Sequence, residues 1–329
     1  MIESFDLRFP SDGSVLDVEG LEVKSEERLV VFGPNGAGKS TLLRLLAGTL
    51  PGGPVLDSTY LPQRPYLFRG SAGFNMGLGL SAEEANRARQ LADRLGVGEV
   101  LEYEASSLSG GEAQRVAIAR AMARQRPWVL LDEPLSAQDE QDRMRIAAVI
   151  IEELGDRGAV IITHDREEAA VLGNRLAVLV NGRLLQEGSV DEVFSLPASD
   201  LVASAVGIGN VIDGKVVAGD GPLTSVLAGS MTIWGLGEVP PGRPGRALFG
   251  AESVTLFRGR EGAAGSARNR WVGTVTELRH LGRLVEVVID AGNRVVALVT
   301  PGSQEVLQLG PGANVTLTVK ATAVRVNPR

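Results

Sequence analysis

The glycine-rich stretch from Gly33 to Thr41 has the residue types needed to bind the phosphates of a nucleotide. It fits the pattern G-x-x-x-x-G-K-[ST] and follows an apolar run, Leu29–Phe32. Glycines let the backbone turn tightly and bring N–H groups against phosphate oxygens, and the start of the helix expected next favours anions. Lys39 is placed to reach the β and γ phosphates of ATP, and Ser40 to ligate Mg²⁺.

Two carboxylates, Asp132 and Glu133, follow a second apolar run at Val129–Leu131. A buried strand ending there places both at the carboxyl edge of a sheet, where ligands bind in wound α/β folds. Asp132 is suited to hold Mg²⁺, and Glu133 to polarise an attacking water. Such a pair also occurs at ordinary strand ends, but together with the phosphate loop it predicts ATP hydrolysis.

A third element begins at Ser109, which is followed by Gly110 and Gly111. Ser109 can cap a helix, and the glycines expose N–H groups at its start, so the segment is a second candidate anion site. An ordinary capped helix is the alternative interpretation.

These motifs require an alternation of strands and helices through the first 200 residues, as in a wound α/β layer. The pattern predicts strands at Arg28–Phe32, Thr59–Leu61, Trp128–Leu131, Ala159–Thr163 and Leu176–Val180. It predicts helices at Thr41–Ala47, Ala82–Leu95, Gly111–Ala123, Asp139–Leu154 and Glu167–Leu172. Asn181-Gly182 indicates a hairpin turn into Arg183–Gln186, and a short helix is expected within Gly188–Phe194.

The sequence pattern changes after about residue 200, where helical periodicity fades and short β-rich runs lie between glycines and prolines. We therefore expect a nucleotide-binding domain over 1–200 and a β-barrel or sandwich over 201–329, with an exposed linker at 258–270 that could divide the tail. The expected strands are Val211–Val217, Ala247–Phe257, Trp271–Leu278, Arg283–Ile289, Arg294–Thr300 and Asn314–Val326.

Composition narrows the possible functions of the 329-residue chain. It has no cysteine, which excludes disulfides and thiolate metal sites. Residues 1–200 carry 20 Lys+Arg against 31 Asp+Glu, and this acidity argues against nucleic-acid binding. The first residues do not form a secretory signal, and the apolar runs are too short to span a bilayer. A soluble, cytoplasmic chain is expected, whose membrane role would need a partner.

With these motifs in this order, the chain resembles the nucleotide-binding subunit of an ATP-binding-cassette (ABC) transporter. The family's signature LSGGQ reads Leu108-Ser109-Gly110-Gly111-Glu112 here. The resemblance implies an α/β phosphate-loop NTPase domain followed by an all-β, OB-like TOBE domain. It also implies that Gln63 senses Mg²⁺ and the permease, and that His164 contacts the γ-phosphate.

The same resemblance assigns further residues. Asp139 ends an Asp loop whose third residue is Gln138 where leucine is usual, and Phe9 stacks on adenine, with Phe5 as its rival. The catalytic residues implied are Glu133, His164 and Gln63, and the Mg²⁺ ligands are Ser40, Gln63 and Asp132. The ATP site implied comprises Phe9, Gly33, Pro34, Asn35, Gly36, Ala37, Gly38, Lys39, Ser40 and Thr41, with Ser109, Gly110, Gly111, Glu112 and Asp139 contributed by a second copy.

The family works as a head-to-tail homodimer, in which each signature loop covers ATP held by the other copy. The implied partners are two transmembrane permease subunits and, indirectly, an extracytoplasmic solute-binding protein, with no nucleic acid. The implied location is peripheral, at the cytoplasmic face of the inner membrane. The spacing from Lys39 to Gln63 is shorter than in most import ATPases, so we expect a trimmed adenine-side β-subdomain.

The tail gives a weaker indication of the solute. Arg270–Val326 resembles the molybdate-binding form of the TOBE domain, so molybdate or tungstate import is the leading interpretation. Sulfate, polyamine, sugar and Fe³⁺ import stay open, as does a non-transport ATPase whose tail is only a dimerisation scaffold. Thr300, Ser303 and Lys320 are candidate oxyanion ligands but equally plain surface residues. His280 has no pattern around it and is expected to be structural or solvated.

Overall fold

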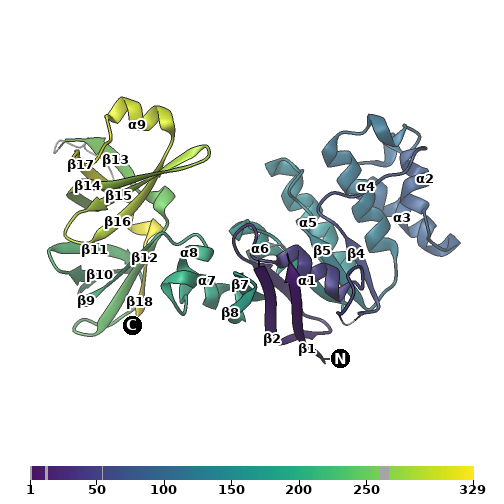
Figure 1. Ribbon diagram of the computed structural model, residues 1–329, viewed down its shortest axis with the longest axis horizontal. Helices are drawn as coiled ribbons and strands as arrows, with labels where there is room; N and C mark the ends of the chain where they lie inside the picture. The colour runs from purple at the N-terminus through teal and green to yellow at the C-terminus, as the bar shows by residue number, and fades with distance from the viewer. Residues whose placement is uncertain (1, 12–13, 54, 260–266) are drawn as a thin grey trace. The chain divides into compact units, whose positions relative to one another are not determined.

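The computed structural model describes residues 2–11, 14–53, 55–259 and 267–329. The chain divides into two compact units, Met1–Val193 and Phe194–Arg329. The first unit combines helices with a sheet, and the second consists mainly of strands (Figure 1).

A six-stranded sheet forms the centre of the first unit, in the order β4-β5-β6-β3-β7-β8. All neighbours are parallel except β8, which returns antiparallel to β7 after the predicted Asn181-Gly182 turn. β5 and β6 are buried along their whole length, as expected of strands covered on both faces. The strands are β3 (Arg28–Phe32), β4 (Ser58–Leu61), β5 (Trp128–Asp132), β6 (Gly158–Ile162), β7 (Arg175–Val180) and β8 (Arg183–Ser189). All five strands predicted for this sheet are present.

Most helices of the first unit begin at a side chain that accepts one of their free N–H groups, whereas the helix after the phosphate loop begins at Gly38 without a side-chain cap. Ser81 and Ser109 form complete capping boxes, and Asp139 and Asp165 cap the next two helices. The helices α2, α3 and α4 lie side by side (Figure 1). The bounds are α1 (Lys39–Leu46), α2 (Ala72–Gly77), α3 (Ala82–Arg94), α4 (Gly110–Ala123), α5 (Glu140–Leu154), α6 (Arg166–Leu172) and α7 (Val190–Ser195). The six-residue α2 was not predicted.

An antiparallel hairpin, β1 (Ile2–Ser11) and β2 (Ser14–Lys24), was not predicted either. It buries Leu7, Val18 and Leu21 against the same core as α1. Between α1 and β4, the described residues form no strand and only one isolated bridge, Ala47 to Val55. The described part of the connection between α1 and β4 therefore lacks the strands of a β-subdomain, as expected, whereas the N-terminal hairpin is present.

The second unit contains a closed barrel, β10-β11-β18-β12-β9, and a five-stranded sheet, β13-β17-β14-β15-β16. One hydrophobic cluster spans both, and Phe249 and Trp271 stack in it with ring centroids 6.3 Å apart. The strands are β9 (Asn210–Asp220), β10 (Leu223–Ala228), β11 (Met231–Leu236), β12 (Pro244–Phe249), β13 (Thr255–Arg258), β14 (Asn269–Leu281), β15 (Leu284–Asp290), β16 (Arg294–Val299), β17 (Asn314–Val319) and β18 (Arg325–Pro328). Two helices accompany them, α8 (Asp200–Ala205) and α9 (Pro301–Leu307).

Two of the strands predicted in the tail are each two strands. The run Ala247–Phe257 is broken by a 3-10 turn at Ala251–Ser253, and Asn314–Val326 by another at Ala321–Ala323. The breaks occur because each run crosses between sheets: β12 and β18 belong to the barrel, while β13 and β17 pair in the other sheet. The sheets therefore do not divide at 258–270. Of that expected linker, residues 260–266 lie outside the described residues.

Candidate active site

The predicted phosphate loop joins the end of β3 to the start of α1. Gly33, Gly36 and Gly38 have φ values of 153°, 80° and 101°, which side chains rarely allow. A Cβ on Gly33 would lie 2.0 Å from the carbonyl oxygen of Leu179 on β7, so only glycine fits there. The loop's N–H groups and the start of α1 together form a concave, electropositive backbone surface suited to phosphate.

Lys39, the first residue of α1, folds back over this loop. Its Nζ donates to the carbonyl oxygens of Gly33 at 2.8 Å and Pro34 at 3.0 Å, and the residue is only 7% exposed. Burial lowers the pKa of Lys39, although Glu133 and Asp132 oppose that shift. Two of its three N–H groups hold the loop, which leaves the third to reach a phosphate oxygen.

Asp132 ends β5 and is 3% exposed. Its Oδ1 is buried and has no hydrogen-bond partner among the described residues. Burial raises the pKa of Asp132, and the hydroxyl of Ser40 and the charge of Lys39 oppose the shift. A buried, unpaired carboxylate oxygen beside a serine hydroxyl is costly for an apo protein but fits a hard cation such as Mg²⁺, so these residues suit the metal that the sequence predicts.

Asp132→Asn should therefore stabilise the fold while it removes the predicted metal ligand. The raised pKa of Asp132 means that its ionised carboxylate destabilises the folded chain. The gain in the free energy of unfolding should therefore be present near pH 8. It should disappear as pH falls through the Asp132 pKa, because the native carboxyl then becomes neutral too. We expect about 1 kcal/mol, or roughly 2–4 °C in unfolding midpoint. Thermal unfolding without nucleotide at both ends of this pH range tests it, and a lower midpoint for the variant at pH 8 would contradict it.

Glu133 lies where three distant segments meet. Gln63, after β4, donates through Nε2 to Glu133 Oε2 at 2.8 Å, and His164 Nδ1, after β6, lies 3.1 Å from Glu133 Oε1. Glu133 itself has φ 49°, a left-handed conformation that costs a non-glycine residue about 1–3 kcal/mol. The structure thus brings together Gln63, Glu133 and His164, the three residues that the sequence predicted to act in catalysis.

The signature segment has a different environment. Ser109 donates to the Glu112 carboxylate through its N–H at 2.8 Å and its hydroxyl at 2.7 Å, and the Glu112 N–H donates back to Ser109 Oγ at 3.3 Å. These bonds lower the pKa of Glu112, which keeps it ionised. Among the described residues, the hydrogen-bond partners of Ser109–Glu112 come from α4 and the segment after β5, not from the phosphate loop.

The remaining predicted residues are placed less decisively. Asp139 is exposed and caps α5 by accepting from the Asp142 N–H at 2.9 Å. Phe5 and Phe9 of β1 are both half-buried and pack against the hydrophobic core of the first unit. Their positions do not distinguish them, so the choice of Phe9 as the adenine-stacking residue stays a prediction. Two further residues were predicted to bind ATP. Asn35 lies in the turn of the phosphate loop, and Thr41 lies in the first turn of α1.

In the tail, Thr300 caps α9 and its hydroxyl lies 3.0 Å from that of Ser303. No described interaction joins Lys320, which is exposed, to either residue. His280 is an exposed residue near the end of β14. The oxyanion ligands proposed from the sequence therefore have ordinary surface and capping positions, and their role stays a prediction.

Sequence reasoning missed the residues that support His164. The Thr163 hydroxyl donates to buried Glu168 at 2.7 Å and accepts from the Asp165 N–H at 3.1 Å. Arg143 of α5 lies 3.4 Å from Asp165. These contacts fix the turn from β6 into α6, on which His164 sits. The Asp165 cap three residues before Glu168 was the available sequence signal.

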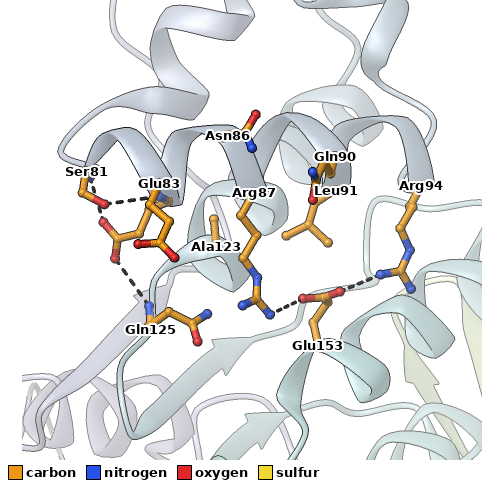
Figure 2. A pocket seen from close by; sticks show the side chains of 11 residues that line it. Ser81, Glu83, Asn86, Arg87, Gln90, Leu91, Arg94, Ala123, Gln125 and Glu153 are labelled. Carbon is orange, nitrogen blue, oxygen red and sulfur yellow. Dashed lines mark hydrogen bonds and ion pairs between the residues drawn. The ribbon is translucent and has the colours of Figure 1, made fainter.

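A hollow of about 650 Å³ lies away from these residues, between α3 and α5 (Figure 2). Arg87 and Arg94 of α3 both point to Glu153 of α5, at 2.7 and 2.6 Å, and that carboxylate side chain is 11% exposed. The hollow contains none of the predicted site residues. Its ion pairs join α3 to α5.

Together, the parallel sheet, the glycine loop and the carboxylates at the end of β5 define a phosphate-loop nucleotide hydrolase. Comparison with known proteins narrows this class. The ABC transporter family profile matches residues 16–136, and the TOBE domain profile matches residues 265–326.

A molybdate/tungstate import ATP-binding protein of Pyrococcus horikoshii is 32% identical over 335 residues, covering 93% of this chain and 94% of that protein. An Fe(3+) ions import ATP-binding protein of Streptomyces avermitilis is 35% identical over 277 residues, covering 76% and 78%. Among solved structures, an ATP-bound bacterial Atm1-family ABC exporter matches with TM-score 0.54 and 26% identity, covering 62% of this chain and 41% of that one.

This chain therefore belongs to the ABC transporter family, with an ATP-hydrolysing domain followed by a TOBE domain. The resemblance inferred from its motifs is confirmed, as is the fold class. In the part of the chain that the structure describes, no helix is long and apolar enough to cross a membrane.

Proposed function

We propose that this chain is the nucleotide-binding subunit of an ABC importer and that molybdate or tungstate is the solute. Three archaeal relatives named as molybdate/tungstate import ATP-binding proteins support this, because they are 32–35% identical over 80–93% of this chain. Relatives of 31–36% identity import Fe³⁺, sn-glycerol-3-phosphate, or spermidine and putrescine, so these remain the alternatives, with sulfate and sugars behind them.

The arrangement around Glu133 carries the enzymatic part of the proposal. Its carboxylate is oriented by Gln63 on one oxygen and lies beside His164 on the other, so it can polarise a water that attacks the γ-phosphate. Lys39 neutralises phosphate charge. Ser40, Asp132 and Gln63 would hold Mg²⁺, which when bound neutralises charge on the β and γ phosphates.

The signature segment acts in this proposal on the ATP of a second copy. Ser109 and Gly110 are exposed at the start of α4, and the backbone there suits a phosphate brought from outside the chain. The N–H and hydroxyl of Ser109, which donate to Glu112 in the single chain, would turn from that carboxylate to the phosphate. A head-to-tail homodimer would form two equivalent sites, in each of which the signature of one copy meets the phosphate held by the other. Gly111, Glu112 and Asp139 would lie at the same interface. Closure around ATP excludes water other than the nucleophile.

The permease would dock near Gln63 and the segment Arg69–Gly77. Aromatic side chains are exposed there: Tyr66 is 70%, Phe68 49% and Phe74 53% exposed, and the Tyr66 and Phe68 rings meet edge-on with centroids 5.0 Å apart. A patch of this kind in one small region fits a protein interface. We infer two permease subunits, one on each copy, and a peripheral position at the cytoplasmic face. A solute-binding protein would act through the permease.

Uptake into proteoliposomes tests the solute. The full chain and its permease would be reconstituted with internal ATP and Mg²⁺, and uptake of molybdate, tungstate, sulfate, Fe³⁺ and spermidine compared in the presence of the solute-binding protein. We expect ATP-dependent uptake of molybdate and tungstate only. Uptake of another solute alone would replace the oxyanion assignment, and ATP hydrolysis that no permease or solute stimulates would favour the alternative of a non-transport ATPase with a scaffold tail.

Glu112→Gln should strengthen ATP-driven dimerisation about 3- to 10-fold. The native carboxylate accepts the Ser109 hydroxyl and carries a charge next to where the partner's γ-phosphate would arrive, whereas an amide keeps an acceptor for the cap without the charge. Analytical ultracentrifugation with ATP measures it. Because the effect is electrostatic, it should shrink at high salt. Equal dimerisation of both forms at low salt would contradict it.

A further inference from the structure

Gln138 occupies the Asp-loop position where the family usually has leucine, and its side chain is in a polar network instead of an apolar contact. The residue is 6% exposed. Its Oε1 accepts from the Arg115 guanidinium at 2.7 Å, and its Nε2 donates to the Gly111 carbonyl oxygen at 3.3 Å. Both partners belong to α4, close after the signature serine. A buried amide satisfied on both ends fixes the two segments it joins.

The Arg115 guanidinium, in the same chain, depends on this amide for its shortest hydrogen bond. Arg115 has a side chain that is 14% exposed, and its Nε has no partner among the described residues. Its guanidinium also donates to the Asp142 carboxylate on α5 at 3.3 Å, and its charge contributes to the lowered pKa of Glu112. Removing the Gln138 amide would therefore take away the shorter of these two hydrogen bonds and leave Arg115 paired with Asp142 alone, so that α4 would lose its link to the Asp loop.

The Asp loop also approaches the signature helix closely. A Cβ on Gly111 would lie 3.1 Å from the Ala137 carbonyl oxygen and 3.4 Å from Gln138 Oε1. On its other side the loop is joined to the hydrolysis site, because Ser136 donates to the Glu133 carbonyl oxygen through its N–H at 3.3 Å and its hydroxyl at 3.0 Å. A short hydrogen-bonded path thus runs from Glu133, through residues 136–138, to Gly111.

We propose that Gln138 is a positioning residue that fixes the signature segment relative to Glu133, and so links the ATP held by a chain to the ATP that its signature covers on the partner. This inference rests on the proposed head-to-tail dimer. Leucine at this position would pack in the same volume but could neither accept from Arg115 nor donate to Gly111. The signature would then be free to shift without any change at the phosphate loop.

The test separates nucleotide binding from dimer closure. In a Glu133→Gln background, Gln138→Leu should weaken ATP-driven dimerisation about tenfold, measured by analytical ultracentrifugation. Binding of a fluorescent ATP analogue to dilute monomer should stay unchanged, because Lys39 and its loop make no contact with Gln138. Gln90→Leu, at an exposed glutamine of α3, is the matched control and should change neither quantity.

Arg115→Met and the double variant Gln138→Leu with Arg115→Met complete a double-mutant cycle. If the two residues act as one link, Arg115→Met should weaken dimerisation to a similar extent and the double variant no further. Unchanged dimerisation of Gln138→Leu, additive losses in the double variant, or an equal loss of monomer nucleotide affinity would each overturn the inference. A Glu133→Gln parent that stays monomeric with ATP would instead overturn the proposed dimer, and this inference with it.

Discussion

Glu133→Gln should reduce ATP turnover at least about 100-fold while ATP still drives dimerisation. An amide keeps the size of the side chain and can still bond to Gln63 and His164, but it cannot polarise the attacking water. Steady-state phosphate release measures the first effect, and light scattering after size-exclusion chromatography with ATP the second. The combination is informative because a general loss of structure would remove both.

Glu83→Gln is the matched control, since Glu83 is an exposed carboxylate on α3 away from the site. It should retain full activity. If Glu133→Gln kept near-normal hydrolysis with the permease present, another group would have to orient the water. His164 would be the next candidate, because it lies within hydrogen-bond distance of the same carboxylate.

Lys39→Ala should reduce affinity for ATP about 100-fold. The substitution removes the buried ammonium that bonds to Gly33 and Pro34, so it loses both the charge facing the phosphates and the support of the loop. Isothermal titration calorimetry with ATP and Mg²⁺ on the full chain measures it.

Lys24→Ala provides the control for charge. Lys24 is a surface lysine on β2 whose contact with Glu22 is 3.6 Å long and solvent-exposed, so its loss should leave ATP affinity unchanged. ATP binding by the Lys39 variant equal to that of the native chain would count against the phosphate-loop role of Gly33–Thr41.

The site was more predictable from the sequence than the tail was. Lys39 follows one short apolar run in the spacing of the phosphate-loop pattern, Asp132 and Glu133 directly follow another, and the strand-end rule places them at one edge of the sheet. Gln63 and His164 came from the family resemblance, and no local pattern would have shown that their side chains meet at Glu133. That meeting depends on the order of β4, β5 and β6 in the sheet.

Four of the described strands were missed, β1 and β2 in the N-terminal hairpin and β10 and β11 in the tail, and the sequence held usable signals for them. In the N-terminal hairpin, Leu7 and Phe9 alternate with charged residues, as do Leu16 and Val18 across from them, which is the period of a half-buried strand. In the tail, Gly221 and Gly229 bound the run Leu223–Ala228, which is short and partly polar.

The strand breaks in the tail could not be predicted from periodicity. Gly250–Val254 and Lys320–Val324 are compatible with extended structure, and each makes a 3-10 turn because its two flanking strands pair in different sheets. Partner choice across sheets is a tertiary property. The contacts of Gln138 are similar, because its polarity was visible in the sequence but its partners on α4 were not.

The central claim is that the signature of one copy covers the nucleotide of the other, and energy transfer between two variants tests it most directly. The chain has no cysteine, so Ser107→Cys, at an exposed position two residues before Ser109, gives a unique site for an acceptor dye. This labelled chain would also carry Lys39→Ala, and the nucleotide would be kept at a concentration too low for its weakened site to bind. Its unlabelled partner would carry Glu133→Gln and a fluorescent ATP donor.

We predict strong energy transfer when the two chains are mixed with Mg²⁺, and its loss when excess unlabelled Glu133→Gln chain with ATP competes for the partner. Under these conditions the donor is bound to the unlabelled chain, so strong transfer places the labelled signature close to the partner's site. Absence of transfer, with both chains folded, the donor bound and the permease supplied, would contradict the account.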